Sequence, residues 1–136
     1  MDSVSPERRS QIMGRVTSKH TRPELAVRKL LHGLGYRFRL HRKDLPGKPD
    51  LVLPKWRVVV LVHGCFWHRH PGCPNTRTPK SRLDFWTTKF DENVRRDEVA
   101  HERLQTLGWR VLTVWECELK DMPALAARVK TFIEGR

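Results

Sequence analysis

The feature that most constrains the fold is an apolar segment near the middle of the chain, Trp56-Arg-Val-Val-Val-Leu-Val62. Valine is branched at Cβ and favours extended backbone, and a strand without polar alternation is typically buried on both faces of a sheet. Trp109-Arg-Val-Leu-Thr-Val114 has the same character. A long helical pattern over residues 83–107, closed by Gly108, separates the two segments. We therefore expect two buried strands joined by a helix.

The other segments extend this core into a mixed α/β sheet. A first helix is expected to begin at Thr21, which can cap it, with Pro23 in the first turn and Glu24 at the capping-box position. Hydrophobic patterning also predicts strands at residues 36–40 and 50–53 and a last helix at residues 122–133. The order α-β-β-β-α-β-α implies a mixed central sheet flanked by helices.

The balance of charge points to nucleic acid as the partner. The 136 residues include 27 Lys and Arg against 15 Asp and Glu, a net charge of +12 that attracts polyanions. The basic residues are spread through patterned segments rather than gathered in a tail, and no basic amphipathic segment suits a membrane surface. No apolar run is long enough to cross a bilayer, and no secretion signal begins the chain. We expect a cytoplasmic protein without a membrane partner.

Composition divides the chain into two parts. Residues 1–20 are polar and basic, and Ile12, Met13 and Val16 form their only sizeable apolar group. We expect them to form a basic N-terminal arm, either a short helix or a segment that its ligand orders. Residues 21–136 have the length and patterning of a single folded domain.

All three cysteines of the chain fit a metal site. Glycines and prolines in residues 64–83 predict a loop without regular structure, and a long loop in a compact domain is commonly functional or held by a metal. Cys65, His70 and Cys73 lie in this loop, and Cys117 follows the strand that ends at Val114. Three thiolates and one imidazole suit a closed tetrahedral zinc site. His68 is the alternative imidazole ligand, and three buried inert thiols are the alternative to any metal.

A second set of residues suits phosphodiester hydrolysis. Asp50 opens one predicted strand, and the next strand runs into His63 and His68, an arrangement in which a carboxylate can hold Mg²⁺ against a phosphate. Glu24 falls on the inner face of the first helix, although it is equally suited to the capping box. Asp97 falls on the apolar stripe of the long helix, where a histidine would be its natural partner. A solvated helix face is the alternative for Asp97.

These motifs resemble those of the very-short-patch repair (Vsr) endonucleases, bacterial enzymes that nick beside the thymine of a T:G mismatch. The resemblance covers almost the whole chain. Its most specific parts are His63-Gly-Cys-Phe-Trp-His68 and Trp115-Glu-Cys117, with Leu45-Pro-Gly-Lys-Pro-Asp50 before them. It implies a restriction-endonuclease-like fold of the PD-(D/E)xK class with a structural zinc loop.

The resemblance also implies roles for individual residues. Asp50 and the backbone carbonyl of Val62 would bind Mg²⁺. His68 would act in acid/base chemistry, oriented by Asp97, while Glu24 and His63 would order metal-bound water. The implied zinc ligands are Cys65, His70, Cys73 and Cys117, and the side chains implied to enter the DNA are Met13, Phe66, Trp67 and Trp86. For Trp86, a place in the core is the alternative.

We therefore expect an Mg²⁺-dependent endonuclease that nicks duplex DNA 5′ to the mismatched thymine of a T:G pair and so initiates repair of deaminated 5-methylcytosine. The family further implies a monomer, a MutL-type helper, a cognate cytosine methyltransferase and a place near the bacterial nucleoid. Two other functions fit the sequence. One is a sequence-specific nuclease without mismatch preference, and the other is a zinc-dependent DNA-binding module without catalysis.

Overall fold

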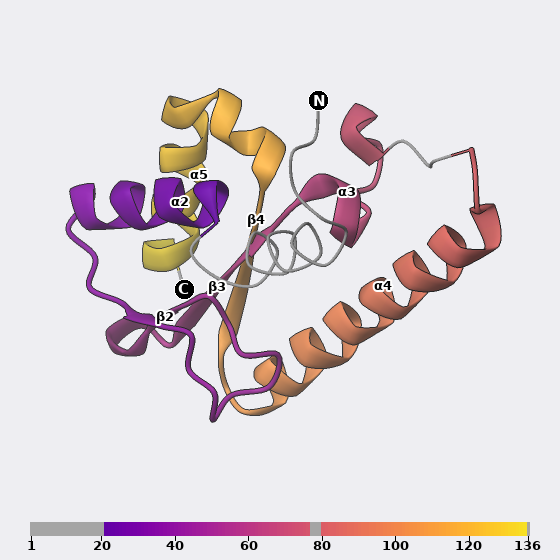
Figure 1. Cartoon of the computed structure of the whole chain (residues 1–136). Coiled ribbons are helices and arrows are strands. Elements are labelled where there is room, and N and C mark those ends of the chain that lie inside the picture. Colours follow the sequence, from indigo (N-terminus) through magenta and orange to yellow (C-terminus); the bar gives the residue numbers. More distant parts are fainter. Residues whose placement is uncertain (1–20, 77–79, 136) are drawn as a thin grey trace, which may run out of the picture.

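A four-stranded mixed sheet carries the fold, with the strands in the order β1-β2-β3-β4. Three of them, β2, β3 and β4, are labelled in Figure 1. The computed structural model describes residues 21–76 and 80–135, so the expected arm at residues 1–20 lies outside the described part. The strands are β1 (Arg39–Leu40), β2 (Leu51–Leu53), β3 (Val58–His63) and β4 (Arg110–Trp115). β1, β2 and β3 pair antiparallel, whereas β3 and β4 are parallel. This confirms the predicted mixed sheet.

Helices cover both faces of the sheet. The described helices are α2 (Arg22–Gly33), the single turn α3 (Cys65–His68), α4 (Leu83–Thr106) and α5 (Met122–Gly135). α2 and α5 pack on one face, and α4 connects β3 to β4 across the other (Figure 1). Among the described residues, no helix combines the length and the apolar character that crossing a membrane requires.

The position of β3 between two cores explains why its sequence lacks polar alternation. Val58 and Val60 belong to the core beneath α2 and α5, whereas Val59 and Leu61 belong to the core beneath α4. Successive side chains of a strand point to opposite faces, so both faces of β3 need apolar residues. The parallel pairing of β3 with β4 follows from the long crossover through α4.

Two expectations about local structure need correction. Only Arg39–Leu40 of the expected strand 36–40 pairs with β2, although Tyr36 still packs into the core. Residues 64–83 do contain regular structure, because α3 forms at Cys65–His68 and a 3₁₀ turn forms at Pro74–Thr76. The four residues of α3 include neither glycine nor proline, so one helical turn fits between Gly64 and Pro71.

Candidate active site and metal centre

Asp50 lies at the entrance of β2, where it is fixed by its neighbour across the sheet. The backbone N–H of Val62 donates to Asp50 Oδ2 at 2.8 Å. Burial raises the pKa of Asp50 to about 6; the hydrogen bond from Val62 lowers it, and the adjacent charge of Glu24 raises it. A half-buried carboxylate beside a second carboxylate is stabilised by a bound cation, and carboxylate oxygens are the ligands that Mg²⁺ prefers.

Glu24 serves both the helix and the site. Its backbone N–H donates to Thr21 Oγ1 at 3.3 Å, which caps α2, while its side chain is 2% exposed and faces inward. Arg28 and His41 both contact the carboxylate. Burial acts to raise the pKa of Glu24, but the hydrogen bond and charge of His41, with the contribution of Arg28, outweigh it and lower the pKa. Glu24 is therefore an ionised group directed toward Asp50.

His41 is the member of this group that sequence reasoning missed. It follows β1, and its backbone N–H donates to Asp50 O at 3.1 Å, which extends the β1–β2 pairing by one step. One donor atom each from Glu24, His41 and Asp50 lies within 4.8 Å of the others. The only sequence signal was a histidine between an alternating segment and the turn before Asp50.

A second group faces the same cavity from the other side. His68 Nδ1 lies 2.6 Å from Asp97 Oδ2, which connects α3 to α4. The ring of His63 stacks on that of His68 with centroids 3.9 Å apart. Burial, with a further contribution from His68, lowers the pKa of His63 to about 4, so His63 is neutral at neutral pH. Asp97 has a histidine partner and does not lie on a fully solvated helix face.

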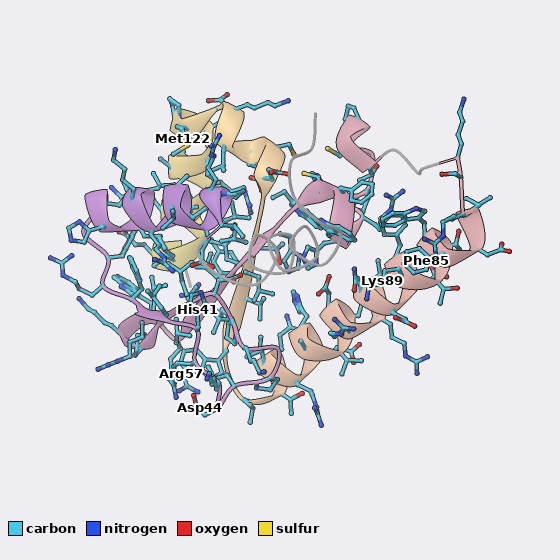
Figure 2. The ribbon with its side chains drawn as sticks, viewed as in Figure 1. His41, Asp44, Arg57, Phe85, Lys89 and Met122 are labelled. Carbon is cyan, nitrogen blue, oxygen red and sulfur yellow. The ribbon has the colours of Figure 1, made fainter. Side chains whose placement is uncertain are left out.

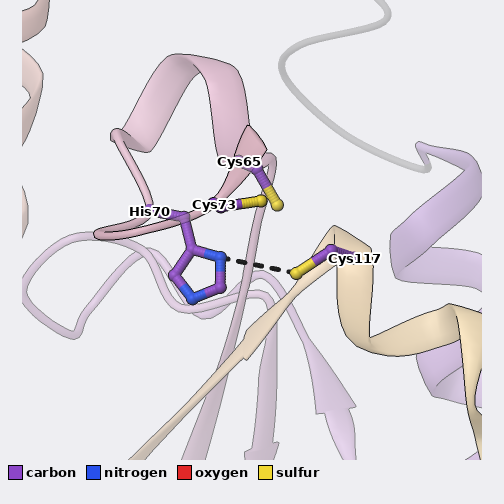
Figure 3. Close-up of side chains that lie close together, drawn as sticks. All are labelled: Cys65, His70, Cys73 and Cys117. Carbon is purple, nitrogen blue, oxygen red and sulfur yellow. Dashed lines mark hydrogen bonds between the residues drawn. The ribbon is translucent and has the colours of Figure 1, made fainter. Parts of the chain in front are cut away.

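The three cysteines and His70 meet because of the register of β3 and β4. His63 is paired with Trp115, so Cys65 and Cys117, each two residues further along, lie side by side. α3 and the turn after it then return His70 and Cys73 to the same point (Figure 3). The structure places His70 in this group and His68 with Asp97.

The donor set of this cluster fits a divalent metal. Cys117 Sγ lies 3.4 Å from His70 Nδ1 (Figure 3). The ring of His70 stacks on that of Trp115, with the ring centroids 4.2 Å apart. Burial raises the pKa of Cys117 to about 12, and the adjacent Cys65 and Cys73 add to this. Three thiols crowded together are hard to ionise without a cation, and a closed set of three sulfurs and one nitrogen is typical of structural zinc.

Aromatic side chains join α3 to the first turns of α4. The ring of Phe66 contacts those of Trp67, Trp86 and Phe90. Trp86 stacks on Phe90, with the ring centroids 5.7 Å apart. Trp86 is half-buried and packs on Phe90, but it belongs to neither core cluster of the described residues. Phe85 is 48% exposed and lies toward the end of α4 that extends away from the sheet (Figure 2). Phe66 and Trp67 also border a hollow beside the start of α2. Met13 lies outside the described residues.

One cavity of about 470 Å³ brings the carboxylate side and the histidine side together. Asp50 and His41 line it from the connection between β1 and β2, and the opposite side is lined by His63, His68 and Asp97. Lys43 and Lys48 are exposed at its edge. A half-buried carboxylate, a histidine oriented by an aspartate and flanking lysines form a site suited to an anionic substrate.

Comparisons with known proteins match this chain to DNA mismatch and nicking endonucleases. The sequence model described as DNA mismatch endonuclease Vsr matches residues 1–74. The type II nicking enzyme V.XorIIP of Xanthomonas oryzae is 56% identical over 98% of this chain and 97% of its own length. The DNA mismatch endonuclease Vsr of Escherichia coli is 42% identical over 93% of this chain and 84% of its own.

The fold has a solved counterpart as well. The catalytic domain of the homing endonuclease I-Bth0305I superposes with a TM-score of 0.57, covering 83% of this chain and 94% of that domain at 21% identity. This likeness confirms the predicted endonuclease fold class. The extent and identity of the sequence matches lead to one conclusion: the chain belongs to the Vsr family of DNA mismatch endonucleases.

Proposed function

We propose that this endonuclease nicks duplex DNA on the 5′ side of the mismatched thymine of a T:G pair, and that it requires Mg²⁺. The nick would initiate very-short-patch repair of deaminated 5-methylcytosine. The observation that supports this most is the single cavity lined by Asp50 on one side and by His63, His68 and Asp97 on the other. A monomer with one such site cuts one strand.

The carboxylate side would hold the cation. Asp50 is the proposed protein ligand, with its other oxygen fixed by Val62 N–H, and Glu24 lies close enough to order water at the same point. Bound Mg²⁺ would supply Lewis-acid polarisation of the scissile phosphate. The proposed carbonyl ligand belongs to Val62, whose amide already faces Asp50.

The histidine side would handle the proton. Asp97 accepts from Nδ1–H of His68, so the neutral ring has an unprotonated Nε2. His68 would take a proton from the attacking water as the water oxygen bonds to phosphorus and the bond to the 3′ oxygen breaks. The departing 3′ oxygen takes a proton from solvent, so the products are a 3′-hydroxyl and a 5′-phosphate. His63 is neutral and stacked on His68, so it imposes no charge repulsion when His68 becomes protonated.

Asp97→Asn is expected to slow nicking by roughly 10- to 100-fold, because the amide no longer fixes the tautomer of His68. The rate is measured in single turnovers with saturating enzyme, so that DNA binding does not limit it. Asp91→Asn, at an exposed position of the same helix, is the matched control and should leave the rate unchanged. Equal rates for Asp97→Asn and the control would contradict the role of Asp97.

DNA recognition would use the aromatic side chains beside the zinc loop. Phe66 and Trp67, with Trp86 behind them, are proposed to wedge into the base stack, and Met13 of the arm at residues 1–20 is proposed to enter from the opposite groove. A mismatched step stacks and pairs poorly, so separating it costs less than separating a matched step. The domain at residues 21–136 would supply the remaining contacts.

The protein is expected to nick a T:G duplex at least about tenfold faster than the matched T:A duplex, since opening a paired step costs a few kcal/mol more. The experiment compares both duplexes at one salt concentration with Mg²⁺. Equal rates would favour a nicking enzyme without mismatch preference. Binding without any nicking would favour a zinc-dependent DNA-binding module.

The proposed biological setting follows from this reaction. A cytosine methyltransferase would create the 5-methylcytosine whose deamination gives the T:G pair, and a MutL-type mismatch-repair protein is a proposed helper. We place the enzyme, as a monomer, with the DNA of a bacterial cytoplasm.

A further inference from the structure

His41 occupies a position that the structure fixes firmly. Its backbone N–H donates to Asp50 O, and its φ of 47° lies in the left-handed region. Few residues other than glycine adopt this conformation, which persists only where the surroundings determine it. The side chain is directed into the cavity that Asp50, His63 and His68 also line, and it is 13% exposed.

The ring nitrogen of His41 faces the carboxylates rather than solvent. Nε2 lies 3.0 Å from both Oε1 and Oε2 of Glu24, and Arg28 also binds Oε2. Asp50 completes the group within 4.8 Å. One imidazole nitrogen and two carboxylates therefore converge on one point.

The spacing suits a shared cation. Two ligands at right angles, each about 2.1 Å from an octahedral ion, lie roughly 3 Å apart. This matches the 3.0 Å separation between His41 Nε2 and each Glu24 oxygen, so an ion bound by His41 would be bound by Glu24 directly instead of through water. An ion pair between His41 and Glu24 would have the same spacing. The distance alone therefore does not distinguish a metal ion bound by His41 Nε2 and Glu24 from a direct hydrogen bond between them.

We propose that His41 is a ligand of the divalent cation held by Asp50, and that its nitrogen makes the site favour Mn²⁺ over Mg²⁺. This inference rests on the proposed function, since it concerns the same cation site. Mg²⁺ is a hard ion that prefers oxygen ligands, whereas first-row transition metals accept imidazole more readily. Replacing the nitrogen by an oxygen should therefore weaken Mn²⁺ binding more than Mg²⁺ binding.

The charges around the site are consistent with a cation at this point. Carboxylate oxygens of Glu24 and Asp50 lie within 4.8 Å of each other, so two acidic groups share a small space. A divalent ion between Glu24, His41 and Asp50 would relieve the repulsion between the two carboxylates. It would take the place of the direct hydrogen bond between His41 and Glu24.

Pulsed electron paramagnetic resonance of Mn²⁺ tests the proposal directly. The full chain, loaded with zinc, is titrated with Mn²⁺ alone. We expect the Mn²⁺ signal to show ¹⁴N coupling from a bound imidazole. The coupling should change to that of ¹⁵N when the histidines are labelled with ¹⁵N. The wild-type protein alone therefore shows whether a histidine binds the ion. Asp50→Asn should remove this binding, which locates the ion at the site.

His41→Gln then identifies which histidine binds. Glutamine can still hydrogen-bond to Glu24, so Glu24 keeps its position while the nitrogen ligand is lost. We expect the coupling to disappear and Mn²⁺ affinity to fall about tenfold or more, with Mg²⁺ affinity changed less than about threefold. His32→Gln, at an exposed position near the end of α2, is the matched control and should behave as wild type.

Three outcomes would overturn the proposal: no nitrogen coupling in the wild type, coupling that persists in His41→Gln, or equal losses of Mn²⁺ and Mg²⁺ affinity, which would make His41 a positioning residue only. Nicking of T:G and T:A duplexes by the same samples separates this failure from failure of the proposed function. Nitrogen-coupled Mn²⁺ in a protein that never nicks would leave the ligand assignment intact and reject the function.

Discussion

Asp50→Asn is expected to reduce nicking at least about a thousandfold while it stabilises the zinc-loaded protein without Mg²⁺ at neutral pH. Loss of the carboxylate removes the proposed cation ligand, which contributes several kcal/mol to transition-state stabilisation. The asparagine oxygen can still accept from Val62 N–H, so the hydrogen bond at 2.8 Å has a replacement. Activity and stability should therefore change in opposite directions.

The stability effect follows from the pKa of Asp50. Its folded-state pKa of about 6 lies above the ordinary value of 3.8, so the folded protein binds the proton more tightly than the unfolded chain. The resulting stabilisation is complete below pH 3.8 and is lost as the pH rises through 6. The difference between the two values corresponds to about 3 kcal/mol.

Thermal unfolding between pH 5 and pH 7.5 measures this effect. The wild type should lose stability relative to Asp50→Asn as the pH rises. Asp44→Asn is the matched control, because Asp44 is a 62% exposed carboxylate on the same connection between β1 and β2. Parallel pH profiles for wild type and Asp50→Asn would show that burial does not penalise the Asp50 charge.

Cys117→Ser is expected to lower the unfolding temperature by about 10 °C or more and to abolish nicking. Cys117 is the one cluster member outside the 65–73 segment, so the proposed zinc joins that segment to the end of β4. Loss of several kcal/mol of metal binding gives a temperature change of this size in a domain of this length. His68 lies between Cys65 and His70, so the catalytic geometry should be lost with the metal.

Elemental analysis and calorimetry check this result. The wild type should contain about one zinc atom per chain, and Cys117→Ser should contain much less. Glu116→Gln changes an exposed neighbour of Cys117 without removing a thiol and should keep both zinc and stability. Full stability in a zinc-free wild type would contradict a structural metal.

Local patterns were sufficient for most of the secondary structure. The valines of β3 and the spacing of Phe90 and Leu104 on α4 predicted a strand buried on both faces and a helix with one inner face. The 36–40 segment was predicted less well, because pairing with the very short β2 limits β1 to Arg39–Leu40. Strand length depends on the partner, which a local pattern does not contain.

The candidate site was predictable where a residue's neighbours in sequence reveal its role. Asp50 before a strand and Asp97 on an apolar stripe both indicated inward-facing carboxylates. His41 had no such signal, since only the pairing of β1 with β2 places it beside Asp50. Its contact with Glu24 joins residues 17 positions apart.

By itself, the sequence determined the family, the α/β class and the set of residues able to bind metal, because periodicity and motif spacing are local properties. Only the tertiary structure decided which histidine belongs to which group. His68 and His70 are two residues apart and chemically alike, but the turn of α3 directs one to Asp97 and the other to Cys117. That choice depends on the register of β3 with β4, which pairs His63 with Trp115 across 52 residues of chain.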